Sequence, residues 1–86
     1  MLKIYGSMLC PDCVECRNCL DKKGITYEYF DFADSLLYLK EFLAVRDSNP
    51  IFQNVRADRK IGIPCLILED GTVTLDWESY VSQDNA

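Results

Sequence analysis

The sequence predicts a small α/β fold in which a mixed four-stranded sheet is flanked by helices, in the order β-α-β-α(α)-β-β-α. Short segments rich in apolar, β-branched and aromatic residues alternate with longer segments whose apolar residues recur every three or four positions. Glycine, proline and helix-capping residues stand at the boundaries between these segments. The chain has 86 residues, the size of one domain with a modest core, so we expect a single domain over residues 1–86.

The first part of the chain alternates strand and helix. Leu2–Tyr5 is predicted to form a short strand. A helix is predicted over Pro11–Lys23, because proline is favoured at the first helical position and Gly24 follows as a C-terminal cap. Ile25–Phe30 is rich in β-branched and aromatic residues and is predicted to be the second strand. Since a helix joins these two strands, we expect them to be parallel.

The middle of the chain predicts a longer helix followed by a short one. Asp34 or Ser35 is expected to cap the longer helix. Its apolar residues at helical spacing should form one face: Leu36, Leu39, Phe42 and Leu43. Asn49–Pro50 has the capping and first-position residues of a short further helix. The residues expected to face inward there are Ile51, Phe52 and Val55.

The last part of the chain predicts a hairpin and a terminal helix. Cys65–Leu68 is a continuous apolar run, typical of a buried central strand. Asp70–Gly71 is a strong hairpin signal, so Val73–Leu75 should return as an antiparallel strand. Asp76 is expected to cap the terminal helix, and a polar tail, Ser82–Ala86, ends the chain. The apolar residues of that helix are Trp77, Tyr80 and Val81.

Charge and hydropathy exclude several functional classes. Nine basic and fourteen acidic residues give a net charge of −5, which repels phosphate, so no nucleic-acid binding is expected. No apolar stretch approaches the roughly 20 residues that cross a bilayer, and the first residues lack the pattern of a secretory signal. We therefore expect a monomeric, cytoplasmic protein without membrane contact. The absence of histidine excludes Ser/His and Cys/His catalysis.

The cysteines are the residues most indicative of chemistry. There are five, and four of them lie between Cys10 and Cys19, unlike the dispersed cysteines of secreted disulfide scaffolds. Cys10 and Cys13 flank Pro11 and Asp12 where the first strand passes into the first helix. The free N–H groups and dipole of a helix N-terminus stabilise a thiolate, so Cys10 should point outward and Cys13 should be more buried. This arrangement suits thiol–disulfide exchange.

The sequence resembles the glutaredoxins of the thioredoxin-like superfamily in two motifs. One is Cys-Pro-Asp-Cys at the start of the first helix, and the other is Gly-Ile-Pro at Gly62–Pro64, before a buried strand. The resemblance covers nearly the whole chain in element order. It implies that Cys10 is the nucleophile and Cys13 the resolving thiol. It also implies that Pro64 is cis and that the Ile63 backbone pairs with the substrate. The implied substrates are disulfide-containing proteins or glutathione mixed disulfides, with glutathione or another thiol as the reductant.

Two stretches depart from the glutaredoxin pattern. Glutaredoxins commonly carry a lysine or arginine shortly before the first cysteine, where this chain has Ser7–Leu9. They also carry a Gly-Gly pair and a Ser/Thr-Asp pair after the hairpin, of which only Asp76 has a counterpart. Positive charge for a glutathione carboxylate would then come from Arg56, Arg59 or Lys60. The alternative is that these three residues are simply a solvated face.

A second interpretation is a metal-binding protein on the same fold. At about 100° per residue, Cys13 and Cys16 are neighbours on one helix face, and Cys19 lies further round. Cys10, Cys13 and Cys16, with Cys65 as a possible fourth ligand, would hold zinc or another soft metal. The alternative is that Cys16, Cys19 and Cys65 are small buried apolar residues.

A third interpretation is a binding module on a thioredoxin-like fold with vestigial activity. The aromatic residues outside the cysteine motif do not distinguish these interpretations, because packing explains them better than ligand stacking. Those expected in the core and sheet are Phe42, Phe52, Trp77, Tyr27 and Tyr29.

Overall fold

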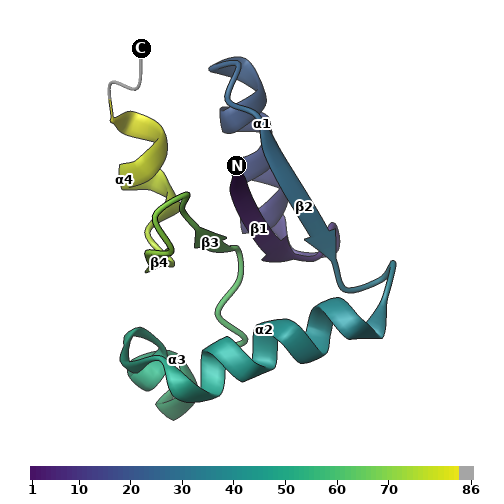
Figure 1. The fold of residues 1–86 in the computed structure, drawn as a ribbon, viewed down its shortest axis with the longest axis vertical. Helices are drawn as coiled ribbons and strands as arrows, with labels where there is room; N and C mark the ends of the chain where they lie inside the picture. The colour runs from purple at the N-terminus through teal and green to yellow at the C-terminus, as the bar shows by residue number, and fades with distance from the viewer. Residues whose placement is uncertain (84–86) are drawn as a thin grey trace.

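The computed structural model describes residues 1–83 and confirms a small α/β architecture (Figure 1). The elements are β1 (Leu2–Gly6), α1 (Pro11–Lys22), β2 (Tyr27–Asp31), α2 (Leu36–Ser48), the 3₁₀ turn η1 (Pro50–Phe52), α3 (Gln53–Ala57), β3 (Cys65–Ile67), β4 (Val73–Thr74) and α4 (Trp77–Ser82). Residues 84–86 of the predicted polar tail lie outside the described residues. Within residues 1–83, every helix is too short or too polar to cross a bilayer.

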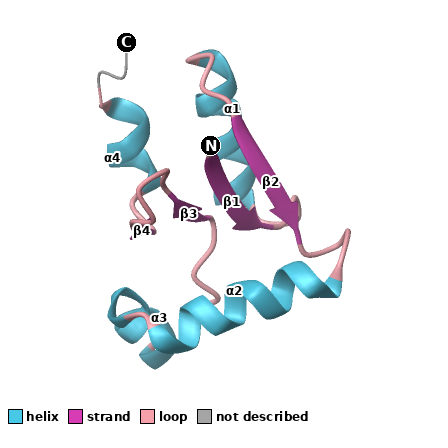
Figure 2. Cartoon of the chain, in the orientation of Figure 1, coloured by secondary structure: helices cyan, strands magenta, loops and turns pink. Residues whose placement is uncertain are grey.

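The four strands form one mixed sheet in the order β2-β1-β3-β4 (Figure 2). β1 pairs with β2 in parallel, with Ile4 opposite Tyr29, and with β3 in antiparallel fashion, with Ile4 opposite Leu66. β4 returns antiparallel to β3, and the Leu68 N–H donates to the Thr72 carbonyl at 2.8 Å to close the hairpin. The predicted strand directions are confirmed, and β1 and β3 occupy the centre of the sheet.

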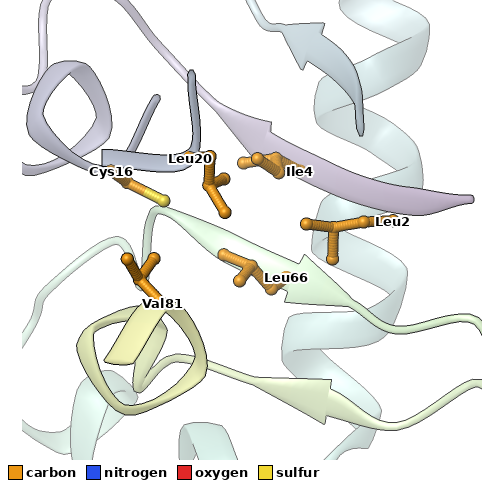
Figure 3. Packing of buried hydrophobic residues seen from close by; sticks show 6 residues of the cluster. All are labelled: Leu2, Ile4, Cys16, Leu20, Leu66 and Val81. Carbon is orange, nitrogen blue, oxygen red and sulfur yellow. The ribbon is translucent and has the colours of Figure 1, made fainter. Parts of the chain in front are cut away.

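One face of the sheet is covered by α1 and α4. Leu2 and Ile4 lie two positions apart on β1 and therefore share this face, whereas Lys3 and Tyr5 lie on the other. They meet Cys16 and Leu20, which lie one turn apart on α1, in an apolar cluster. Figure 3 shows the six buried members of this cluster, namely Leu2, Ile4, Cys16, Leu20, Leu66 and Val81.

The opposite face is covered by α2 and η1. Tyr5 and Cys65 point to this side, one position along from Ile4 and Leu66. Phe42 of α2 is fully buried, and its ring centroid lies 5.8 Å from that of Phe52 and 6.5 Å from that of Tyr5. Helices on both faces, as the sequence predicts, thus enclose two aromatic and aliphatic clusters.

Two side chains expected to face the core are exposed instead. Leu36 is 73% exposed, because the first turn of α2 lies outside the part of the helix that packs against the sheet around Phe42. Ile51 is 44% exposed, since η1 is a three-residue turn in which the neighbouring Phe52 takes the inward position. The predictions for Leu36 and Ile51 were wrong.

All four strands begin or end one or two residues away from the prediction: β1 continues to Gly6 and β3 ends at Ile67, while the starts or ends of β2 and β4 have local causes. β2 begins at Tyr27 because the Ile25 N–H still donates to the Leu20 carbonyl, at 3.0 Å, and completes the end of α1. β4 ends at Thr74, whose hydroxyl accepts the Asp76 N–H at 3.1 Å and turns the chain into α4. Local hydrogen bonds at helix ends therefore shorten both strands.

Candidate dithiol site

Cys10 is the N-cap residue of α1. Its backbone is extended, and its Sγ accepts the N–H of Cys13 at 3.4 Å while its carbonyl accepts the N–H of Val14 at 3.1 Å. Pro11 occupies the first helical position, where an N–H would have no partner within the helix. Cys10 is partly exposed, as predicted, at a helix end whose N–H groups and dipole attract negative charge.

Cys13 lies one turn further along and is fully buried. Burial is the largest cause that raises the pKa of the Cys13 thiol; the Cys10 sulfur also raises it, and the Ser7 backbone N–H and the Tyr29 hydroxyl lower it. Together these groups leave the pKa of Cys13 at about 12. Cys13 is therefore a neutral thiol behind the accessible Cys10. The predicted difference in exposure between the two cysteines is confirmed.

The segment Gly62–Pro64 lies beside Cys10. The Ile63–Pro64 peptide is cis, as the resemblance implies. Gly62 has φ +93°, and a β carbon there would lie 2.9 Å from the Phe52 ring, so glycine lets the chain pass over that ring. Cys10 and this segment line one cavity of about 430 Å³. The other lining residues are Val55, Arg59, Lys60, Ile61 and Leu75.

Two of the three predicted cationic residues lie at this cavity. Arg59 and Lys60 are exposed and form part of its lining. Arg56 points elsewhere and donates to the backbone carbonyls of Arg46 and Asn49. Arg46 in turn donates to the Lys60 carbonyl at 2.8 Å. The arginine pair therefore holds the segment in place, and Arg59 and Lys60 are the cations available to a ligand.

The predicted metal ligands are not all brought together: Cys10 and Cys13 are neighbours, but Cys16 and Cys65 lie on opposite faces of the sheet. Cys16 packs against α4 on one face of the sheet (Figure 3), and Cys65 packs with Phe42 and Phe52 on the other. Among residues 1–83, no three histidine, cysteine, aspartate or glutamate side chains are grouped so that they could hold a metal ion. Cys16 and Cys65 are fully buried and serve as small core residues. Cys19 is half-buried at the edge of the first cluster.

The three buried thiols predict a loss of stability at alkaline pH. An ordinary thiol has a pKa of 9.0, whereas burial raises the pKa of Cys13, Cys16 and Cys65 to about 12 in the folded protein. Below pH 9 the thiols are protonated in both the folded and unfolded chain. Between these pKa values the unfolded chain releases the protons and the folded chain retains them, so the free energy of unfolding should fall.

Urea denaturation in the presence of a reductant, repeated at rising pH, measures this loss. Cys65→Ala should make the decline with pH shallower, because one raised pKa is removed. Leu36→Ala, which removes an exposed side chain that has no thiol, should leave the slope unchanged. If the urea concentration at the midpoint of unfolding stays constant as the pH rises above 9.0, burial does not raise the pKa of these thiols.

Two residues beside the dithiol were not identified from the sequence. Tyr29, predicted only to pack, has its hydroxyl near the Cys13 Sγ. Both atoms lie 2.8 Å from the position that a β carbon on Gly6 would take. The Arg17 guanidinium carbon lies 4.4 Å from the centroid of the Tyr29 ring. The sequence predicted that the strands carrying Ile4 and Tyr29 run parallel. It did not predict that α1 packs on the face of the sheet where the Tyr29 side chain lies.

Comparison with known proteins gives one relative of unknown activity. A protein of Haemophilus influenzae, described as uncharacterized, is 40% identical to this chain over 73 residues, which are 85% of the length of each. No protein-family model matches the chain. No solved structure matches it either.

Proposed function

The chain belongs to the family of this Haemophilus influenzae protein, and we propose that it is a thiol–disulfide oxidoreductase with a thioredoxin-like, glutaredoxin type of fold. Its substrates are protein disulfides or glutathione mixed disulfides. One observation carries the proposal: Cys10 caps α1, accepts the Cys13 N–H at 3.4 Å and opens onto the cavity that Pro64 lines. Cys13, fully buried one helical turn away, is placed to receive the second half of the reaction.

The proposed reaction has two exchange steps. The Cys10 thiolate attacks one sulfur of the substrate disulfide, whose S–S bond breaks, and the departing sulfur takes a proton from water. Cys13 then loses its proton and attacks the Cys10 Sγ, so that a Cys10–Cys13 disulfide forms and the second substrate thiol leaves. The substrate gains two electrons and two protons. An external thiol, glutathione or another reductant, restores the dithiol.

The cavity supports an anionic substrate. Ile61, Ile63 and Leu75 give it apolar walls, and Arg59 and Lys60 add two cations close to Cys10. In a chain with a net charge of −5, such a local pair concentrates carboxylates at the thiol rather than elsewhere on the surface. Both glutathione and an acidic peptide segment around a disulfide have this chemistry.

The surface around Cys10 also supports protein substrates. Leu9, directly before the nucleophile, is 92% exposed, and Met8 is 45% exposed. Ile61 on the cavity wall is 57% exposed. Large apolar side chains gathered around a reactive group are typical of a contact surface for a partner chain.

Cys13→Ser is expected to react once with a disulfide substrate and then stop. Serine cannot attack the mixed disulfide on Cys10, so the substrate thiol should stay attached and be released only by added reductant. Mass spectrometry of the intact, non-reduced protein followed by peptide mapping measures the adduct and its position. In wild-type protein, alkylation should modify Cys10 well before the buried Cys13.

Cys19→Ser serves as the matched control, because it changes a half-buried cysteine of the same helix and leaves the dithiol intact. It should turn over without accumulating an adduct. An adduct on Cys13 in the wild type, or faster alkylation of Cys13 than of Cys10, would reverse the two roles. Failure of Cys13→Ser to form any adduct would reject the oxidoreductase.

A further inference from the structure

The Tyr29 hydroxyl is buried without a hydrogen-bond partner. Among residues 1–83 it is the one buried side-chain oxygen or nitrogen atom in this condition. Tyr27, two positions earlier on β2, instead donates to Asp21 at 2.9 Å and accepts from Arg17 at 3.2 Å. Buried hydroxyls nearly always have partners, because an unpaired one loses its hydrogen bonds to water without replacement. The Tyr29 hydroxyl is therefore free to donate a hydrogen bond to a group that becomes an acceptor during the reaction.

The unpaired hydroxyl lies beside the resolving thiol. Gly6, at the end of β1, leaves the space that both groups use, since a β carbon there would be 2.8 Å from the Cys13 Sγ and 2.8 Å from the Tyr29 oxygen. The Arg17 guanidinium stacks over the Tyr29 ring, with its carbon 4.4 Å from the centroid. The ring is thus held between β1 and α1 with its polar end at Cys13.

The second exchange step of the proposed reaction requires a hydrogen-bond donor beside the Cys13 sulfur. A neutral thiol is a weak hydrogen-bond acceptor, so Cys13 in its resting, protonated form needs no hydrogen-bond donor beside it. Before it attacks Cys10, Cys13 must become a thiolate in a position that water does not reach, where a charge needs hydrogen-bond donors. Burial raises the pKa of Cys13 to about 12, and the groups that oppose the rise are the Ser7 N–H and the Tyr29 hydroxyl.

We propose that the Tyr29 hydroxyl donates a hydrogen bond to the Cys13 thiolate during the step that resolves the mixed disulfide. This inference rests on the proposed oxidoreductase function. The proton that Cys13 loses is balanced by the proton that the departing substrate sulfur takes up, and Tyr29 keeps its own. The electron pair of the Cys13 sulfur then forms the bond to the Cys10 Sγ, the bond from Cys10 to the substrate sulfur breaks, and that sulfur takes up a proton.

The surrounding charges are compatible with a donor that stays protonated. Burial raises the pKa of the Tyr29 hydroxyl, and Cys13 and Asp31 raise it further, while Arg17 lowers it. The titratable and charged groups facing the pair are Cys10 and Arg17 from α1 and its cap, and Asp31 from the end of β2. A hydroxyl that keeps its proton can donate to the thiolate throughout the working pH range.

Tyr29→Phe, made in a Cys19→Ser background, tests the proposal by removing one oxygen atom. Reduced protein is mixed with an aromatic disulfide reagent that releases a coloured thiolate, once when Cys10 attacks and again when Cys13 resolves the adduct. The first release should be unchanged. The second should be about 10- to 100-fold slower at neutral pH, the effect of one hydrogen bond to a charged group, with its pH profile moved upward. The melting temperature should be unchanged or higher, because an unpaired buried hydroxyl is lost.

Tyr38→Phe is the control, since it removes a tyrosine hydroxyl from α2 on the opposite face of the sheet. Fluorotyrosine at position 29 gives a second variant that retains the hydroxyl and makes it a stronger donor, and it should accelerate the second release. An unchanged second release in both Tyr29 variants would overturn the role of Tyr29 and leave the oxidoreductase standing. Absence of the first release in the parent protein would instead overturn the oxidoreductase itself.

Discussion

Cys10→Ser is expected to reduce disulfide exchange to the rate of the reaction without protein. The substitution removes the attacking sulfur, and a serine hydroxyl neither ionises near neutral pH nor forms a bond to sulfur that a thiol can resolve. Serine is a strong N-cap residue, so it should still accept the Cys13 N–H and keep α1 in place. Activity should therefore disappear from a protein whose fold is unchanged.

Two assays and circular dichroism measure this outcome. One assay follows the reduction of a glutathione mixed disulfide, and the other follows the reduction of a protein disulfide. Cys19→Ser should keep most of the wild-type rate in both. Residual turnover of Cys10→Ser above the background, or an equal loss in Cys19→Ser, would show that another thiol attacks. The ratio of the two wild-type rates reports which substrate class the cavity with Arg59 and Lys60 favours.

Phe42→Ala is expected to lower the free energy of unfolding by about 3–5 kcal/mol. Phe42 is fully buried, and its ring centroid lies 5.3 Å from that of Phe32 and 5.8 Å from that of Phe52. Truncation leaves a cavity where α2 meets the sheet. Small domains have a total stability of only about 5–15 kcal/mol, so this one change should remove a large share of it.

Urea denaturation monitored by circular dichroism measures the loss, with Leu36→Ala as the control on the same helix. Leu36 is 73% exposed, so its truncation should change stability by no more than about 0.5 kcal/mol. Similar losses for both variants would mean that the packed face of α2 is assigned wrongly. Because Phe52 contacts Phe42 and supports the segment at Gly62, Phe42→Ala should also loosen the cavity beside Cys10.

Sequence patterns correctly predicted the helix caps and the hairpin turn, which depend on residues close to one another in the sequence. Ser35, Asn49 and Asp76 cap their helices through hydrogen bonds that span two or three positions, and each is where the sequence placed a cap. The hairpin at Asp70–Gly71 follows from turn chemistry in the same way. Leu36 shows the limit of such patterns, because helical spacing says which residues share a face but not how far along the helix the core extends.

At the candidate site, the unequal exposure of the two cysteines was predictable, since Pro11 starts the helix and the helical period turns Cys13 inward. The other groups that these cysteines meet depend on how the strands and helices pack. Cys16 and Cys65 lie on opposite faces of the sheet, and Tyr29 comes to Cys13 from another strand. The face on which a strand residue lies changes with a shift of one residue in register, and register and helix docking are set by the packing of the whole core.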